Sequence, residues 1–229
     1  MSTLTSIKND GIVSLVVKVG GEIIPDTVSI FSIHIEKSVN RISTAKLAIL
    51  ASTNDIGTFD ESLYDIFILE KELTIEAGYY SVNEIIFKGK ITHQALRIDS
   101  KTGSTIEIIC NDLNFIHARI EANGSIITAL NGDVTVIKPD ANISVAFTIT
   151  YGYDIIEFSG EIDSITQLGN LQARVKFRGT TLAAPAKFIT LGGLGNRFNG
   201  NHFILGVVQT ISNGNWISEI TLGMPDKLF

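Results

Sequence analysis

The last forty or so residues of the chain repeat an earlier segment, and this repeat constrains what the chain can fold into. Residues 73–110 and 188–224 both run through a strand, a polar loop, a strand with a central glycine, a polar turn and a last strand. Self-similarity at a fixed spacing indicates one supersecondary unit used twice. Two copies in one chain predict two related β-barrels rather than a solenoid. The alignment sets Gly78 opposite Gly192 or Gly193, Gly89 opposite Gly206, and Glu107 opposite Glu219.

Alternation of apolar and polar residues indicates that the chain is rich in β-strands. Phe31, Ile33 and Ile35 share one face of a strand, and the same period of two recurs over residues 43–50. Turn signals separate these runs, and Asn131–Gly132 is typical of a tight hairpin. Many short strands at this spacing predict a mainly β fold of antiparallel barrels with little helix.

One helix is expected, over residues 112–122, where Asp112 can cap an apolar stripe that includes Ile116 and Ile120. This stretch also marks the boundary between the two barrels. We therefore divide the chain into a first barrel over residues 1–111, a connecting helix and hairpin over residues 112–144, and a second barrel over residues 145–229.

Composition excludes two classes of function and favours protein partners. The net charge of −6 and the absence of any cluster of Lys and Arg argue against nucleic acid as a ligand. No apolar run reaches the length of roughly 18 residues that a membrane-spanning helix needs. Charged residues make up only 18% of the chain, and hydrophobic residues 45%. Such a composition is consistent with surface that becomes buried against partners, or with a β-rich core.

A glycine-rich segment before the last hairpin is a candidate structural loop. Its Gly-x-Gly start resembles a dinucleotide-binding loop, but a strand follows it, and without a helix N-terminus nothing would hold a pyrophosphate. We expect at least one of its glycines or asparagines to adopt a positive φ, and its phenylalanine to pack inward. The loop comprises Gly193, Gly195, Asn196, Arg197, Phe198, Asn199 and Gly200, and the candidate structural glycines within strands are Gly89 and Gly206.

No constellation of residues in the sequence predicts catalysis, a metal or a cofactor. Cys110 lies in an apolar strand, which is typical of a buried, inert thiol. Carboxylates three apart in a strand fall on opposite faces, so a solvated strand face is the favoured interpretation of the acidic stretch. The histidines are scattered singly, with no partner at metal-ligand spacing. The residues weighed are Asp154, Glu157, Glu161 and Asp163, and His34, His93, His117 and His202.

Residues 149–167 and 175–223 resemble a known family. Their sequences, ITYGYDIIEFSGEIDSITQ and VKFRGTTLAAPAKFITLGGLGNRFNGNHFILGVVQTISNGNWISEITLG, are similar to the hub portion of VgrG-like spike proteins, also called Rhs-element Vgr proteins. These proteins belong to contractile injection systems, which include type VI secretion, phage-tail-like particles and contractile phage tails. The most specific match is the glycine-rich pattern from Gly192 to Gly200, followed by Trp216. Residues 86–92 and 106–112 of the first barrel also look like the family.

The resemblance implies a phage-tail hub fold and a structural role without enzymatic activity. Hubs of this family are homotrimers, and their six barrels form a pseudo-six-fold ring that adapts a hexameric inner tube to a trimeric spike. The partners implied are further copies of the chain, the inner tube protein, a spike tip or C-terminal spike protein, and baseplate proteins. The implied location is the bacterial cytoplasm during assembly and then an injection particle.

Two questions remain open at this level. Relatives carry extra hub segments and continue into a spike, whereas the sequence ends at Phe229, so a natural short hub and a portion of a longer spike chain both fit. The alternative function is a stand-alone β-barrel module that binds carbohydrate or protein. Oligomeric state separates this module from a hub.

Overall fold

A computed structural model describes residues 11–51, 65–99, 103–114, 116–121, 124–138, 144–163 and 170–225. Within these ranges the chain is almost entirely β, and helical geometry is confined to residues 65–66. The strands are β1 (Val13–Val19), β2 (Glu22–Ile23), β3 (Ile30–Ser38), β4 (Thr44–Ala51), β5 (Glu72–Tyr79), β6 (Val82–Asp99), β7 (Gly103–Asn111), β8 (Ile116–Ile120), β9 (Ile126–Leu130), β10 (Asp133–Ile137), β11 (Val145–Thr150), β12 (Ile155–Asp163), β13 (Asn170–Arg178), β14 (Phe188–Gly192), β15 (Gly200–Ser212) and β16 (Asn215–Leu222).

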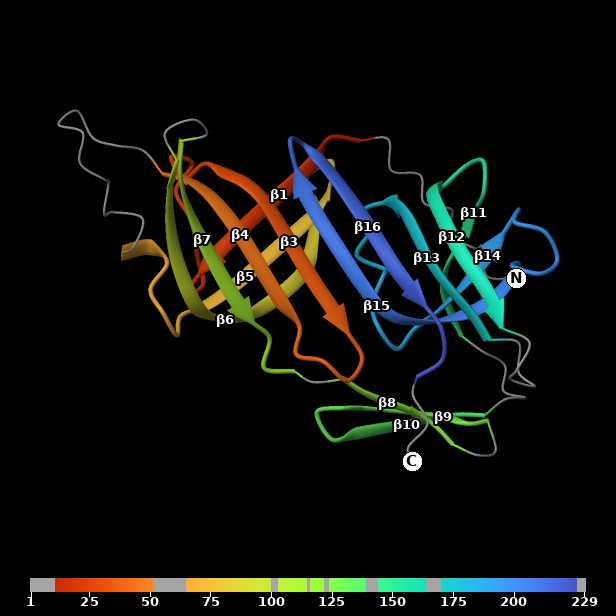
Figure 1. Ribbon diagram of the computed structural model, residues 1–229. Helices are drawn as coiled ribbons and strands as arrows, with labels where there is room; N and C mark the ends of the chain where they lie inside the picture. The colour runs from red at the N-terminus through yellow and green to blue at the C-terminus, as the bar shows by residue number, and fades with distance from the viewer. Residues whose placement is uncertain are drawn as a thin grey trace.

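Thirteen of these strands form one large sheet that builds two lobes with the same strand order (Figure 1). Lobe one has the order β3-β4-β7-β6-β5-β1, and lobe two has the order β12-β13-β16-β15-β14-β11. The lobes are joined edge to edge, because β15 of lobe two pairs antiparallel with β3 of lobe one. The predicted mainly β fold of two related barrels is confirmed.

The equivalence of the lobes extends to the irregularities of their strands. In both lobes the first strand of the order has a bulge against the second, and the long strand of the hairpin has a bulge against its partner. The bulges fall at Ile30/Ser32 in β3 and Ile155/Glu157 in β12, and at Ile91/His93 in β6 and Ile204/Gly206 in β15. When the two lobes are matched at these bulges, Glu107 of β7 is equivalent to Glu219 of β16, as in the sequence alignment.

The same registers show that the predicted equivalence of Gly89 and Gly206 is wrong. His93 pairs with Ile109 just past the bulge of β6, as Gly206 pairs with Thr221 just past that of β15. Sequence comparison matched glycine to glycine and inserted a gap that the strand pairing does not contain. Each glycine nevertheless meets a close neighbour. A Cβ at Gly89 would lie 2.5 Å from the carbonyl oxygen of Asn111, and one at Gly206 would lie 2.6 Å from the hydroxyl of Ser38.

The lobes differ in the direction of one strand. β1 runs antiparallel to β5, whereas β11 runs parallel to β14. The duplicated unit is therefore the set of five strands β3 to β7, repeated as β12 to β16. β1 and β11 occupy the same place in the strand order, but they run in opposite directions relative to the strand beside them.

The hairpin of β15 and β16 contributes to the cores of both lobes. Ile211 and Trp216, at its turn end, are buried in the core of lobe one, whereas Ile204 and Ile220 belong to the core of lobe two. The Trp216 ring stacks on the Tyr79 ring with centroids 5.5 Å apart. The two lobes therefore share one element, although each has its own core.

A small sheet of order β10-β9-β8 lies beneath the large one (Figure 1). The helix predicted over residues 112–122 is wrong, because residues 116–120 form β8 of this sheet. Ala118 and Ile120 are buried and two residues apart, as in a strand. The apolar residues of this short stretch fit a helical stripe equally well, so the sequence pattern does not distinguish the two. The hairpin predicted at Asn131–Gly132 is confirmed by φ angles of 52° and 92°.

Candidate functional site

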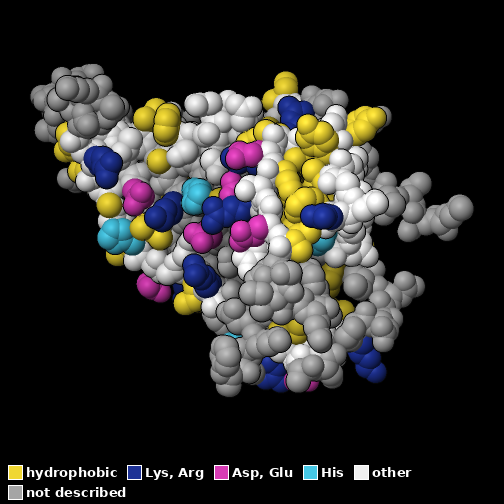
Figure 2. All heavy atoms as spheres, turned by 45° about the vertical axis from the view of Figure 1, so that its right-hand side comes forward, with side chains coloured by type: hydrophobic (Ala, Val, Ile, Leu, Met, Phe, Trp, Pro, Cys, Tyr) yellow, Lys and Arg dark blue, Asp and Glu magenta, His cyan; other side chains and the backbone are white. Residues whose placement is uncertain are grey.

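The large sheet presents a polar outer face across the junction of the lobes. The side chains that alternate with the core residues of β12, β13, β16, β15 and β3 point outward. In the registers they form transverse rows, such as Ser159, Arg174, Thr221 and Gly206. Figure 2 shows acidic and basic side chains gathered on one face of the molecule. A face that carries both charge signs can contact protein or water.

Lys176 occupies the centre of the next row, between two carboxylates. Its Nζ lies 2.7 Å from Oε2 of Glu157 and 3.7 Å from Oε2 of Glu219. The hydrogen bond and the charge of Glu157 raise the pKa of Lys176, and the same contact lowers the pKa of Glu157. Because the three side chains remain open to solvent, this contact contributes little to stability. It fixes the position of a positive charge on the face.

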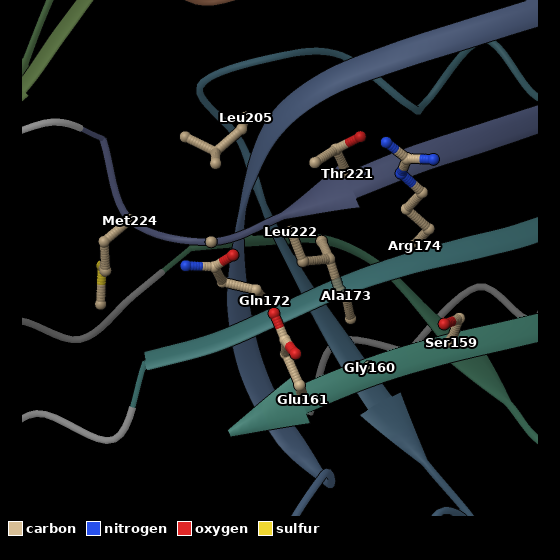
Figure 3. A pocket seen from close by; sticks show the side chains of 11 residues that line it. Ser159, Gly160, Glu161, Gln172, Ala173, Arg174, Leu205, Thr221, Leu222 and Met224 are labelled. Atoms are coloured by element: carbon tan, nitrogen blue, oxygen red, sulfur yellow. The ribbon is translucent and has the colours of Figure 1, made fainter. Parts of the chain in front are cut away.

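An open hollow of about 680 Å³ lies beside this row (Figure 3). Arg174 and Glu161 line its polar side, and Leu205 and Met224 line its apolar side. Arg174 also borders two neighbouring hollows of about 310 and 480 Å³, and it forms no ion pair with any described residue. An unpaired guanidinium presents the fork of donors that a carboxylate binds. Sequence patterns do not predict this hollow, because cross-strand neighbours depend on register.

The glycine-rich loop has the backbone geometry that its sequence predicts. Gly193, Gly195 and Gly200 have φ angles of 78°, 81° and 129°. Phe198 packs against the core of lobe two, and its ring meets that of Phe158 edge to face at 5.4 Å. Both parts of the prediction, positive φ and an inward phenylalanine, are confirmed.

Hydrogen bonds within the loop hold it closed. The amide of Leu194 donates to Oδ1 of Asn199 over 2.8 Å, and the amide of Asn199 donates to the carbonyl of Gly195 over 3.0 Å. Asn196 and Arg197 are exposed at its tip. The strand β15 follows the loop directly, so the loop is a corner of lobe two.

The histidines are distributed over different parts of the fold. His34 is exposed on the outer face, His93 follows the bulge of β6, and His117 lies on β8. His202 is partly buried, with Nε2 2.9 Å from the carbonyl oxygen of Phe198. Burial lowers the pKa of His202, and this hydrogen bond opposes that shift.

The carboxylates of the acidic stretch have separate surroundings. Oδ2 of Asp154 accepts a hydrogen bond of 2.9 Å from the amide of Thr150 and holds the turn between β11 and β12. Glu157 pairs with Lys176, and Glu161 is exposed. Asp163 ends β12, and its side chain lies outside the described residues. The described positions do not bring Asp154, Glu157 and Glu161 together.

Cys110 is fully buried in lobe one, and burial raises the pKa of its thiol to about 12. In the part of the chain that the structure describes, no group of three or more His, Cys, Asp and Glu side chains is placed to hold a metal ion. No helix among the described residues is long and apolar enough to cross a membrane.

The sequence matches the family described as Alg8 N-terminal domain in three overlapping segments, residues 9–114, 106–174 and 165–213. The chain belongs to the Alg8 N-terminal domain family. The segments together include the strands of lobe one, the small sheet and most of lobe two. The chain matches no protein of curated function.

Solved structures with the same fold come from phage tails and a secretion system. The 43 kDa tail protein of prophage MuSo2 from Shewanella oneidensis has a TM-score of 0.58 at 10% identity, over 93% of this chain and 99% of that one. A tail protein from Neisseria meningitidis MC58 has 0.58 at 9%, over 93% and 96%. The Escherichia coli c3393 protein has 0.54 at 9%, over 91% and 76%; it is a component of the type VI secretion system, similar to the T4 bacteriophage tail proteins gp27 and gp5. The chain therefore has the fold of phage tail proteins.

Proposed function

We propose that the chain is a structural hub component in the baseplate of a contractile injection system. Three copies form a ring with pseudo-six-fold symmetry, which adapts the hexameric inner tube to a trimeric spike. Three kinds of support converge: the fold shared with phage tail proteins and a type VI secretion component, the resemblance of lobe two to VgrG-like hubs, and the duplicated lobe.

The observation that carries the proposal is the identical strand order of the two lobes, with bulges at matching positions. A hexameric tube presents six equivalent surfaces, and three chains present six equivalent lobes only if the lobes within a chain resemble each other. When three copies close into a ring, the ring presents six similar lobes to the tube and has exact three-fold symmetry toward the spike.

The partners in this proposal are further copies of the chain, the inner tube protein, a spike tip or C-terminal spike protein, and baseplate proteins. The polar outer face lines a wet central passage, because charged side chains such as Lys176 and Glu219 remain hydrated there. The chain works in the bacterial cytoplasm during assembly and then as part of the particle. Its role is mechanical and needs no cofactor.

Light scattering on the purified chain tests the proposal. We expect a species of three times 24.8 kDa, or a larger assembly built from it. A monomer at micromolar concentration would contradict the hub and favour a stand-alone binding module. In the host, deletion of the gene should abolish functional particles, and a deletion strain that still fires normal particles would rule the hub out.

A further inference from the structure

Two strand edges of the large sheet, one on β12 and one on part of β6, have no described strand beside them. β12 is the first strand in the sheet order, and among the described strands it pairs only with β13. β6 pairs with β5 up to Lys90 and with β7 from Lys90 onward. On the side away from β7, residues 93–98 of β6 therefore have no described strand beside them. The two edges lie at opposite ends of the part of the large sheet that runs from β12 to β6 (Figure 1).

The junction inside the chain shows what each of these edges can pair with. β15 is equivalent to β6 and β3 is equivalent to β12, and β15 pairs with β3 over residues 206–212. We propose that the free edge of β6 in one copy pairs antiparallel with β12 of the next copy, and so reproduces the β15–β3 junction between chains. This inference rests on the proposed ring and specifies how its subunits join.

The equivalence fixes the register of the pairing. Thr210 pairs with His34 inside the chain, and their equivalents by the matched bulges are Arg97 and Ser159. By the same count, Leu96 faces Gly160 and Ile98 faces Phe158. The internal junction supports this geometry, because Oγ1 of Thr210 lies 3.4 Å from Nδ1 of His34.

Burial differs between the equivalent strands in the way this pairing requires. Gln209 and Ile211 of β15 are only 4% and 6% exposed, because β3 covers their strand. Their equivalents on β6, Leu96 and Ile98, are 41% and 71% exposed. Exposed apolar residues on an open edge are a liability unless another chain covers them. A second copy that pairs along this edge would cover both side chains.

Charge favours the same register. Arg97 is exposed and forms no ion pair with a described residue, and Glu161 of β12 is likewise exposed and unpaired. When Arg97 lies opposite Ser159, its diagonal neighbours are Glu157 and Glu161, two residues away on either side. Diagonal pairs in a sheet lie within reach of long side chains. Slipping the register by one residue would set Arg97 opposite Phe158 or Gly160, which point to the core side of β12.

Thiol cross-linking tests the pairing. The variant Arg97→Cys/Ser159→Cys, treated with a short bifunctional thiol reagent, should give covalent trimers on a denaturing gel. Thr210→Cys/His34→Cys is the positive control, since it should link within one chain. Arg97→Cys/Thr221→Cys is the matched negative control, because Thr221 is an exposed residue on an interior strand. Cys110 stays silent, since it is buried with a pKa of about 12.

Each outcome separates the pairing from the proposed function. A wild-type trimer with no cross-linking above the negative control would overturn the pairing and leave the hub intact. A wild-type monomer would overturn both. A ladder that extends beyond three chains would support the strand pairing but contradict closure into a ring.

A charge exchange gives a second measurement. Arg97→Glu should weaken self-association roughly tenfold or more, because like charges then face each other across the junction. Glu161→Arg in the same chain should restore it. Lys46→Glu makes the same charge change on β4, an interior strand, and should leave association unaltered. Equal weakening by Arg97→Glu and Lys46→Glu would show a general charge effect and count against the pairing.

Discussion

Gln209 makes a buried polar contact at the place where the two lobes meet. Nε1 of Trp216 donates to Oε1 of Gln209 over 3.1 Å, and Nε2 of Gln209 donates to the carbonyl of Thr180 over 3.2 Å. Gln209 and Trp216 are only 4% and 2% exposed, so water cannot replace these bonds. The amide thus satisfies two groups, one on β16 and one in the loop after β13.

Gln209→Leu should therefore lower the free energy of unfolding by about 1–3 kcal/mol, because it leaves the Trp216 N–H and the Thr180 carbonyl without partners. Denaturant titration measures this. In a Trp216→Phe background the same substitution should cost less, since the orphaned donor is already gone. Equal costs in both backgrounds would show that the hydrogen bond contributes nothing.

Gly200 has a φ of 129°, with open space where a Cβ would lie. The cost of a side chain there is conformational rather than steric against neighbours, and Gly200→Val should destabilise the chain by about 1–3 kcal/mol. Gln172→Val, at an exposed strand position, is the matched control and should change the unfolding free energy by less than about 0.5 kcal/mol. Similar losses in the two variants would contradict the assignment of strain to Gly200.

Burial lowers the pKa of His202 below its ordinary value of about 6.5. Between the folded and unfolded pKa values the unfolded chain binds more protons, so stability rises with pH. The contribution of neutral His202 to stability is complete at pH values above the ordinary pKa of about 6.5. It is lost as the pH falls from that value through the lower pKa of the folded state. His202→Gln should flatten this part of the profile of unfolding free energy against pH. An unchanged slope would mean that His202 does not carry it.

At the scale of elements, the shared hairpin of β15 and β16 couples the lobes. Trp216, the only tryptophan in the sequence, lies in the core of lobe one on a strand that pairs within lobe two. Unfolding of either lobe should therefore change the surroundings of the Trp216 ring. We expect tryptophan fluorescence and far-UV circular dichroism to give coincident denaturation curves. Two separated transitions would show that the lobes unfold independently.

The sequence was informative about elements with a strong local signal. The period of two in β3 and the turn at Asn131–Gly132 were read correctly, and so were the loop glycines, because each depends on neighbouring residues alone. β8 was misread as a helix because five residues of alternating burial fit both periods. The equivalence of Gly89 and Gly206 failed because register depends on bulges, which a residue comparison does not contain. Arg174, Tyr79 and the free edges were missed because they depend on contacts between distant strands.

At the scale of the whole molecule, one sheet face runs over eight strands, β12-β13-β16-β15-β3-β4-β7-β6. In a trimer joined by β6 and β12, the face of one copy continues into that of the next. Six junctions of one kind then close the ring, three within chains and three between them. Dilution can separate only those between chains, so the smallest unit on disassembly is a chain with both lobes still joined.

In the proposed trimer, the width of the eight-strand part of the large sheet from β12 to β6 would set the diameter of the central opening. Three copies of eight strands give 24 strands around the ring. At about 4.8 Å per strand the circumference is roughly 115 Å, which corresponds to a backbone diameter of about 37 Å before strand tilt widens it. Inward side chains reduce the clear bore to roughly 25–30 Å. A helix of about 10–12 Å, or an unfolded chain, passes such a bore freely. A compact domain of 100 residues, with a radius of gyration of about 13 Å, would be near the limit.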